Sequence, residues 1–290
     1  MRIYPAIEIA VDLDQDPDLG GVIAAEISDD QPLGMEGIWT GARISFQDAA
    51  NRDRALAKLR ARWPEIASEA VDVSDEDWAA RSQAGLGAIV VSDEYIVCPP
   101  WDLPTDPIAP YVVIQPSMGF GTGHHASTQL CMYLMLRSGD LVGRSALDVG
   151  TGSGLLAIMA VQLGASRVVA IDVDPDAIHS AQENLELNQV VGRVDLRVAD
   201  ITDPTTLAGE TFDLILANLT GTMLAREARR IAGLIAPDGR LVAGGFQAHE
   251  VDEVTAALDE AGFRLVETKS EHDWVGVLCR ITNPKSSTAR

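Results

Sequence analysis

Cysteines and long apolar runs are scarce in this 290-residue sequence. The three cysteines, Cys98, Cys131 and Cys279, lie far apart and form no C-x-x-C pair, so neither a disulfide framework nor a cysteine metal site is expected. No stretch approaches the roughly 20 apolar residues that span a bilayer. The N-terminus also lacks the apolar segment of a secretory signal. We therefore expect a cytoplasmic protein with no membrane partner.

Basic residues are also few. The sequence has 22 Lys and Arg against 43 Asp and Glu, which gives a formal net charge of −21. A surface of this sign repels phosphate backbones, so direct nucleic-acid binding is not expected. It attracts basic proteins and speeds their encounter at low salt. Many proteins carry such acidity for solubility alone, so a basic partner is one of two explanations.

The first part of the chain, residues 1–70, predicts a small α+β domain. Apolar and polar residues alternate over the expected strands, and helical spacing appears between them. The order fits a ferredoxin-like β-α-β-β-α-β sandwich. Its expected elements are a strand at Ile3–Ile9, a helix at Leu19–Ile27, a strand at Met35–Phe46, a helix at Asn51–Arg62 and a weakly marked strand at Ser68–Val73.

Residues 71–110 predict a connector. Its acidic start favours a short capped helix that holds Trp78, and Gly87–Val97 resembles a hairpin with its turn at Ser92-Asp93-Glu94. The proline-rich stretch Cys98–Pro104 then interrupts regular structure.

Residues 111–290 alternate strand and helix signals, which predicts a doubly wound, Rossmann-like parallel sheet with helices on both faces. Seven strands are expected, the last two as an antiparallel pair. They end at Val149 and Asp172 and then span Val194–Val198, Phe212–Ala217, Arg240–Gly245, Phe263–Lys269 and Trp274–Ile281, with helices at Ala126–Leu136, Leu155–Leu163, Pro175–Leu187, Met223–Ile235 and His249–Ala261.

A glycine-rich turn follows the first of these strands. Asp148-Val149-Gly150-Thr151-Gly152-Ser153-Gly154 leads into the helix that begins near Leu155. Glycine lets a backbone turn sharply and approach a ligand closely, and the next strand ends in Asp172, where such sheets offer a carboxylate to ribose hydroxyls. The pattern indicates an adenosine-type cofactor, while a bare glycine match also fits a plain tight turn.

The glycine spacing distinguishes between cofactors. A dinucleotide fingerprint reads G-x-G-x-x-G/A, but here the spacing is G-x-G-x-G and Leu155 follows. Asp148, two residues before Gly150, would repel a pyrophosphate but could receive the ammonium of an amino-acid-bearing nucleoside. S-adenosylmethionine therefore fits better than NAD or FAD.

Two further polar residues follow strands at the same sheet edge. Asp200, after Val194–Val198, is placed to accept a hydrogen bond from an adenine amino group, or else caps a turn. Asn218, after Phe212–Ala217, could hold the cofactor's amino-acid part or orient an incoming amine, or else serve as a turn residue.

Upstream of the sheet, residues 116–128 read PSMGFGTGHHAST, with three glycines and two histidines before a helix. His124 and His125 are adjacent, which suits one metal ion poorly, and no acid or cysteine lies nearby, so no metal is expected. We expect both histidines to pack or to hydrogen-bond within the loop.

These motifs resemble those of the PrmA-type ribosomal protein methyltransferases. The matching residues are 120–128, the glycine turn 148–154, 171–175 and Ala217-Asn218-Leu219, and the similarity runs from about Trp78 through the sheet. The resemblance implies methyl transfer from S-adenosylmethionine to lysine or N-terminal amines of ribosomal protein L11, a basic partner, with the N-terminal domain recognising that substrate.

The resemblance also implies roles for individual residues. Cofactor contacts would come from Thr128, Gly150, Asp172 and Asn218, together with Gly152, Asp148 and Asp200 from the patterns above. Phe120 and Thr122 would shape the methyl-transfer pocket, and Asn218 would orient the amine. Alternatives that the residues leave open are methylation of another protein or a small amine, a nicotinamide-dependent oxidoreductase, and a non-catalytic cofactor-binding module.

Overall fold

A computed structural model gives two compact units, residues 1–85 and residues 86–290, which we describe separately. The described residues are 3–11, 32–38, 41–74, 87–92, 94–105, 109–116 and 123–282, with positions 19, 23, 26, 27 and 30.

The N-terminal unit contains a four-stranded antiparallel sheet with the order β2-β3-β1-β4. Helix α2 packs on one face of the sheet through Ala55, Leu56 and Leu59, which are buried with Ile7 and Ile44. The Asp48 side chain caps the helix by accepting a hydrogen bond from the Asn51 amide at 2.8 Å. The elements are β1 (Ile3–Ile9), β2 (Pro32–Ile38), β3 (Gly41–Phe46), α2 (Ala49–Arg62) and β4 (Ser68–Ser74).

One sequence-based prediction for this unit is wrong, and another lies mostly outside the described residues. The single strand expected at Met35–Phe46 is wrong, because β2 and β3 are separate strands that pair with each other. Gly41 has a φ of +146°, and a Cβ there would lie 1.9 Å from the Ile9 carbonyl oxygen, so glycine allows the chain to pass close to β1. Most of the helix predicted at residues 19–27 lies outside the described residues, although Ile23 and Ile27 are buried in the core.

The second unit contains the predicted seven-stranded sheet, with the order β10-β9-β8-β11-β12-β14-β13. The first five strands in this order are parallel, and β14 runs antiparallel to both β12 and β13. Carboxyl ends of the parallel strands therefore share one edge of the sheet. The strands are β8 (Ser145–Val149), β9 (Arg167–Asp172), β10 (Val194–Val198), β11 (Phe212–Asn218), β12 (Ile235–Gln247), β13 (Phe263–Glu271) and β14 (Trp274–Ile281).

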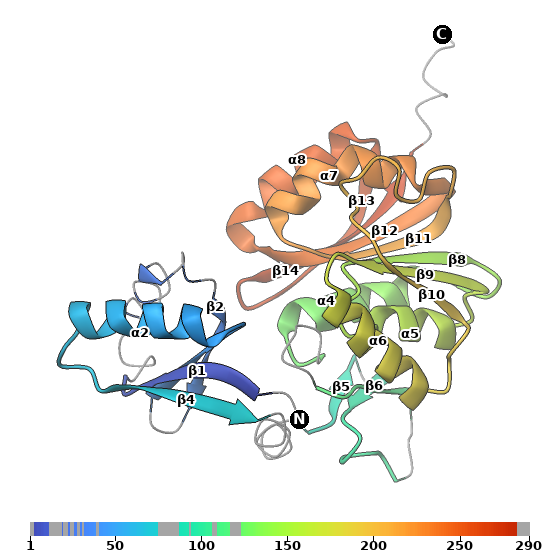
Figure 1. Cartoon of the computed structure of the whole chain (residues 1–290). Helices are drawn as coiled ribbons and strands as arrows, with labels where there is room; N and C mark the ends of the chain where they lie inside the picture. Colours follow the sequence, from blue (N-terminus) through green and yellow to red (C-terminus); the bar gives the residue numbers. More distant parts are fainter. Residues whose placement is uncertain are drawn as a thin grey trace. The chain divides into compact units, whose positions relative to one another are not determined.

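Helices cover both faces of this sheet (Figure 1). Helices α4 (Ala126–Arg137), α5 (Leu155–Gln162) and α6 (Pro175–Leu187) pack on one face, and α7 (Gly221–Gly233) and α8 (Val251–Glu260) on the other. Strand β12 begins earlier than predicted because Ile235 already pairs with Phe212, before a bulge. Helix α7 also begins earlier, since Thr220 caps it by accepting a hydrogen bond from the Met223 amide.

A small sheet precedes α4 in the chain. Strands β5 (Ile89–Val91) and β6 (Tyr95–Cys98) form the predicted hairpin, and β7 (Tyr111–Val113) pairs with β6 in parallel. Residues expected as a connector are thus divided between the units, since Ser74 ends β4 and the hairpin lies in the second unit. The short helix predicted around Trp78 lies outside the described residues.

Among the described residues, no helix has the length and apolarity needed to cross a membrane. Cys98, Cys131 and Cys279 are buried free thiols.

Candidate functional site

The glycine turn after β8 is built from backbone conformations that favour glycine. Gly150, Gly152 and Gly154 have φ values of +69°, +54° and +80°. The amides of Gly150 and Thr151 donate to the Ile171 carbonyl oxygen at 2.9 and 3.0 Å, which ties the turn to the end of β9. A Cβ at position 154 would lie 3.1 Å from the Ala181 Cβ, so helix α6 packs directly on the turn.

Asp172 ends β9, where the sequence placed it, and organises the same turn. Its two carboxylate oxygens accept hydrogen bonds from the Gly152 amide and the Asp174 amide, each at 3.0 Å. Each oxygen has a further lone pair. The carboxylate can therefore hold the loop and still accept hydrogen bonds from the hydroxyl groups of a ligand.

Asp148 lies in β8 beneath the turn and is 1% exposed. Its Oδ2 accepts hydrogen bonds from the Thr151 hydroxyl at 2.7 Å and from the Ala157 amide at 3.1 Å. Burial raises the Asp148 pKa to about 7; the two hydrogen bonds oppose this shift, and the nearby Asp172 charge adds to it. The carboxylate thus supports the turn and the start of α5 from below, whereas the sequence suggested a direct contact with a ligand ammonium.

Asp200 lies two residues beyond β10 and is exposed. Its Oδ1 accepts a hydrogen bond from the Thr202 amide at 2.8 Å, and this bond lowers the pKa of the carboxyl group. The side chain therefore holds its own turn at the carboxyl edge of the sheet.

Asn218 ends β11 and contacts α4. Its Nδ2 donates to the Thr128 hydroxyl oxygen at 3.2 Å. Its Oδ1 is buried and, within the part of the chain that the structure describes, has no hydrogen-bond partner. A Cβ at Gly245 would lie 2.9 Å from this oxygen, so the glycine leaves space beside it. A buried acceptor without a donor is costly, which indicates that a ligand supplies the donor.

The motif at residues 116–128 is described at its two ends, but Phe120 and Thr122 lie outside the described residues. Immediately before the first end, the Gln115 amide donates to Asn184 Oδ1 at 2.8 Å, and Asn184 Nδ2 donates to the Ser153 carbonyl at 2.9 Å. At the other end, a Cβ on Gly123 would lie 3.1 Å from Leu155 Cδ1. Both ends of the motif are therefore held against the glycine turn and the start of α5.

Helix α4 begins beside an aromatic contact at the same edge. His125 is the N-cap residue, and its Nδ1 lies 2.8 Å from the Ser127 hydroxyl oxygen. The His125 and Trp274 rings meet edge to face, with centroids 4.5 Å apart. The neighbouring His124 Nε2 lies 2.9 Å from the Gly87 carbonyl oxygen. From the sequence we expect His124 to contact its own loop, but Gly87 lies outside that loop.

Sequence reasoning missed two residues of this site. Asn184, which is 0% exposed, bridges the glycine turn to the upstream motif. An asparagine on the buried side of a predicted helix, followed four residues later by Asn188, was the available signal, because buried amides need partners. Trp274 carried no such signal, since its contact with His125 joins distant parts of the chain.

Together these residues suit a nucleoside ligand rather than a metal ion. The edge offers the Asp172 carboxylate to hydroxyls, glycine backbone for close approach, and a buried Asn218 oxygen for one donor. Among the described residues, no group of three or more His, Cys, Asp or Glu side chains could hold a metal ion.

Comparisons with known proteins agree with this geometry. The family model described as ribosomal protein L11 methyltransferase (PrmA) matches residues 29–282. A ribosomal protein L11 methyltransferase of Heliobacterium modesticaldum is 36% identical over 236 residues, covering 80% of this chain and 73% of that protein. That of Cupriavidus pinatubonensis is 32% identical over 263 residues, covering 87% and 86%.

A solved structure shares the fold. The ribosomal protein L11 methylase of Lactobacillus delbrueckii subsp. bulgaricus superposes with a TM-score of 0.60 at 27% identity, covering 68% of this chain and 99% of that one. The family match spans most of the sequence and includes every described residue of the site. With its seven-stranded sheet and glycine turn, this chain belongs to the ribosomal protein L11 methyltransferase (PrmA) family and is a methyltransferase.

Proposed function

We propose that this protein transfers methyl groups from S-adenosylmethionine to lysine or N-terminal amines of ribosomal protein L11. The observation that carries the proposal is the buried, unpartnered Asn218 Oδ1 at the carboxyl edge, in a chain whose relatives are named for that activity. The net charge of −21 favours a basic protein substrate over nucleic acid.

The residues present fit the proposed cofactor. Asp172 would accept hydrogen bonds from ribose hydroxyls, and the Gly150 and Gly152 backbone would lie against the ligand. Thr128, which is bonded to Asn218, would contact the cofactor from α4. Asp200 would receive the adenine amino group. Asp148 is buried under the turn, so a ligand ammonium would act on it through its field and lower its raised pKa.

When bound, S-adenosylmethionine would supply a methyl group on a positively charged sulfur. A neutral amine would attack the methyl carbon, so that the N–C bond forms as the C–S bond breaks and the neutral thioether leaves. A lysine ammonium has a pKa of about 10.4 in water and must first lose a proton. A buried cleft lowers that pKa because burial disfavours the charged form. Asn218 Oδ1 would then accept one amine N–H and so orient the nitrogen lone pair, and Phe120 and Thr122 would shape the surrounding pocket. Alignment of this kind supplies roughly 7–11 kcal/mol in well-oriented reactions.

The test is incubation of the purified chain with labelled S-adenosylmethionine and recombinant ribosomal protein L11, followed by mass spectrometry of the product. Label on lysine or N-terminal amines is expected, and the Asn218→Ala variant should transfer far less. If L11 stays unlabelled although the enzyme still binds the cofactor, L11 is rejected as the substrate. A labelled cell lysate would then distinguish another protein or a small amine from a binding module without turnover.

A further inference from the structure

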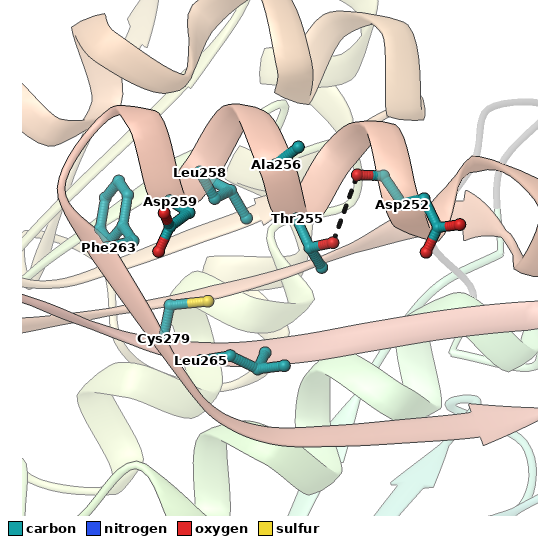
Figure 2. Close-up of a pocket in the computed structure, with 8 residues that line it drawn as sticks. All are labelled: Asp252, Thr255, Ala256, Leu258, Asp259, Phe263, Leu265 and Cys279. Atoms are coloured by element: carbon teal, nitrogen blue, oxygen red, sulfur yellow. Dashed lines mark hydrogen bonds between the residues drawn. The ribbon is translucent and has the colours of Figure 1, made fainter.

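A cavity of about 340 Å³ lies between α8 and the strands β13 and β14. Figure 2 shows Asp252 and Asp259 toward opposite ends of the helix, with Cys279 and Leu265 on the strands beneath it. We call this cavity the α8–β13 groove and define it by Asp252, Thr255, Leu258, Phe263, Leu265 and Cys279. None of these residues belongs to the site described above.

The floor of the groove is apolar. Leu258, Phe263 and Cys279 are at most 2% exposed, whereas Leu265 remains 53% exposed at the mouth. Covering an exposed leucine beside an open cavity removes apolar surface from water, which favours binding of a partly aliphatic group. The volume lies at the lower end of the range for ligand pockets, so it has room for one long side chain.

The polar groups of the groove are hydrogen-bond acceptors. Asp259 is already paired with Arg264. The Asp252 carboxylate has no hydrogen bond or ion pair within the part of the chain that the structure describes. The dashed line in Figure 2 joins the Thr255 hydroxyl to the backbone carbonyl oxygen of Asp252, at 3.4 Å. The Thr255 hydroxyl donates to the Val251 carbonyl at 2.7 Å, which leaves its oxygen free to accept. A free carboxylate and a free hydroxyl oxygen above an apolar floor suit a positively charged donor on an aliphatic stem.

One end of the groove lies toward the carboxyl edge of the sheet. Asp252 lies in the first turn of α8, which follows the carboxyl end of β12 after a single 3-10 turn at Ala248–Glu250. The same end of β12 pairs Gly244 with Asn218. Strand β13 is the last strand of the sheet, so its outer edge is open to a partner beside the groove.

We infer that the α8–β13 groove binds a lysine or arginine side chain of the protein substrate, at a point distinct from the amine that is methylated. The inference rests on the proposed function, because a basic ribosomal protein would supply such a side chain. The aliphatic stem lies on Leu258 and Leu265, and the cation meets Asp252 and Thr255. A second copy of this chain is a poor occupant, because two copies would each carry a net charge of −21.

Two matched pairs of variants test the inference. Asp252→Asn removes the free carboxylate, and Glu253→Gln makes the same charge change at the next exposed residue outside the groove. Leu265→Lys places a cation at the mouth, and Val266→Lys does so at the neighbouring position, which is 59% exposed and outside the groove. With intact L11 as substrate, Asp252→Asn and Leu265→Lys should raise KM about three- to fivefold with kcat unchanged, which is the upper end of what an exposed ion pair contributes. Each control should stay within about twofold.

A second measurement does not depend on methylation. Methyl-labelled full-length protein is titrated with N-acetyl-lysine methylamide and with N-acetyl-arginine methylamide, and the Leu258 and Leu265 methyl resonances are followed by NMR. Saturable shifts that Asp252→Asn abolishes are expected.

The outcomes separate the two proposals. Equal KM values for all four variants, in a chain that methylates L11, overturn the groove and leave the proposed function intact. Failure to methylate L11 rejects the proposed function, and the NMR shifts alone then support or overturn the groove. A concentration-dependent dimer that Leu265→Lys dissociates assigns the groove to a second copy and also overturns the inference. If circular dichroism shows that a variant does not fold, the NMR titration of the wild type decides. Methyl resonances that do not move in that titration overturn the inference.

Discussion

The Asn218 side chain joins the end of β11 to the first turn of α4, donating its amide to the Thr128 hydroxyl oxygen across 3.2 Å. This bond fixes which way the amide faces, because the nitrogen is used by Thr128 and the buried Oδ1 is left for a ligand. One helix and one strand therefore determine the orientation of this acceptor.

Replacing Asn218 tests the value of that orientation. Asn218→Ala should lower kcat roughly a hundredfold, because even about 1 Å of misalignment at a reacting centre costs that much. Thr128→Val keeps the shape but removes the hydroxyl oxygen, so it should cause a smaller loss in the same direction. Steady-state kinetics give both values, and circular dichroism verifies folding. Full kcat in Asn218→Ala would contradict the assignment.

Asp172 is expected to control cofactor affinity. A hydrogen bond to a charged group contributes about 1.5–3 kcal/mol, so Asp172→Asn should raise the dissociation constant of S-adenosylmethionine about 10- to 100-fold. Asp203→Asn is the matched control, because Asp203 also accepts a backbone hydrogen bond, from Thr205 at 2.8 Å, but lies beyond the sheet edge. Isothermal titration calorimetry measures both constants, and equal values would exclude the proposed role.

The buried Asp148 predicts an unusual dependence of stability on pH. Its folded pKa of about 7 lies above the ordinary aspartate value of 3.8, so the protonated acid is favoured in the folded state. The contribution of this carboxyl group to the free energy of unfolding is fully present below about pH 4 and is lost as the pH rises through 7. Asp148→Asn does not titrate.

The free energy of unfolding of the wild type, minus that of Asp148→Asn, should therefore fall by up to about 1.4 kcal/mol per pH unit between pH 4 and 7. It should then level off. Urea titrations at several pH values measure this difference, and a pH-independent difference would show that the carboxyl group is ionised in the folded state throughout.

The stability cost of disturbing the contact between the glycine turn and α6 can be measured separately from the cost of backbone strain. Gly154 and Gly192 have φ values of +80° and +79°, but a Cβ would lie 3.1 Å from Ala181 Cβ at position 154 and have nothing within 4 Å at position 192. Both alanine variants carry a left-handed backbone cost of about 1–2 kcal/mol. Gly154→Ala adds overpacking of about 1–3 kcal/mol. Equal unfolding free energies in urea for the two variants would refute the packing argument.

Local sequence pattern was enough for most of the sheet. The strands ending at Val149 and Asp172 and the helix Pro175–Leu187 were predicted from apolar spacing and turn residues, and the structure confirms them. The hairpin of β2 and β3 was read as one strand, because alternation continues through both and the reversal depends on how Gly41 passes β1. The early start of β12 likewise depends on Ile235 pairing with Phe212.

The sequence by itself determined the fold class, the glycine turn and the acids that end the strands, because each follows from spacing within a short segment. The tertiary structure alone decided where the side chains face. It turned Asp148 under the loop, left Asn218 Oδ1 without a donor in the described residues, and placed Asn184 between the turn and Gln115. These outcomes depend on burial and on partners from other strands and helices, and no local pattern encodes them.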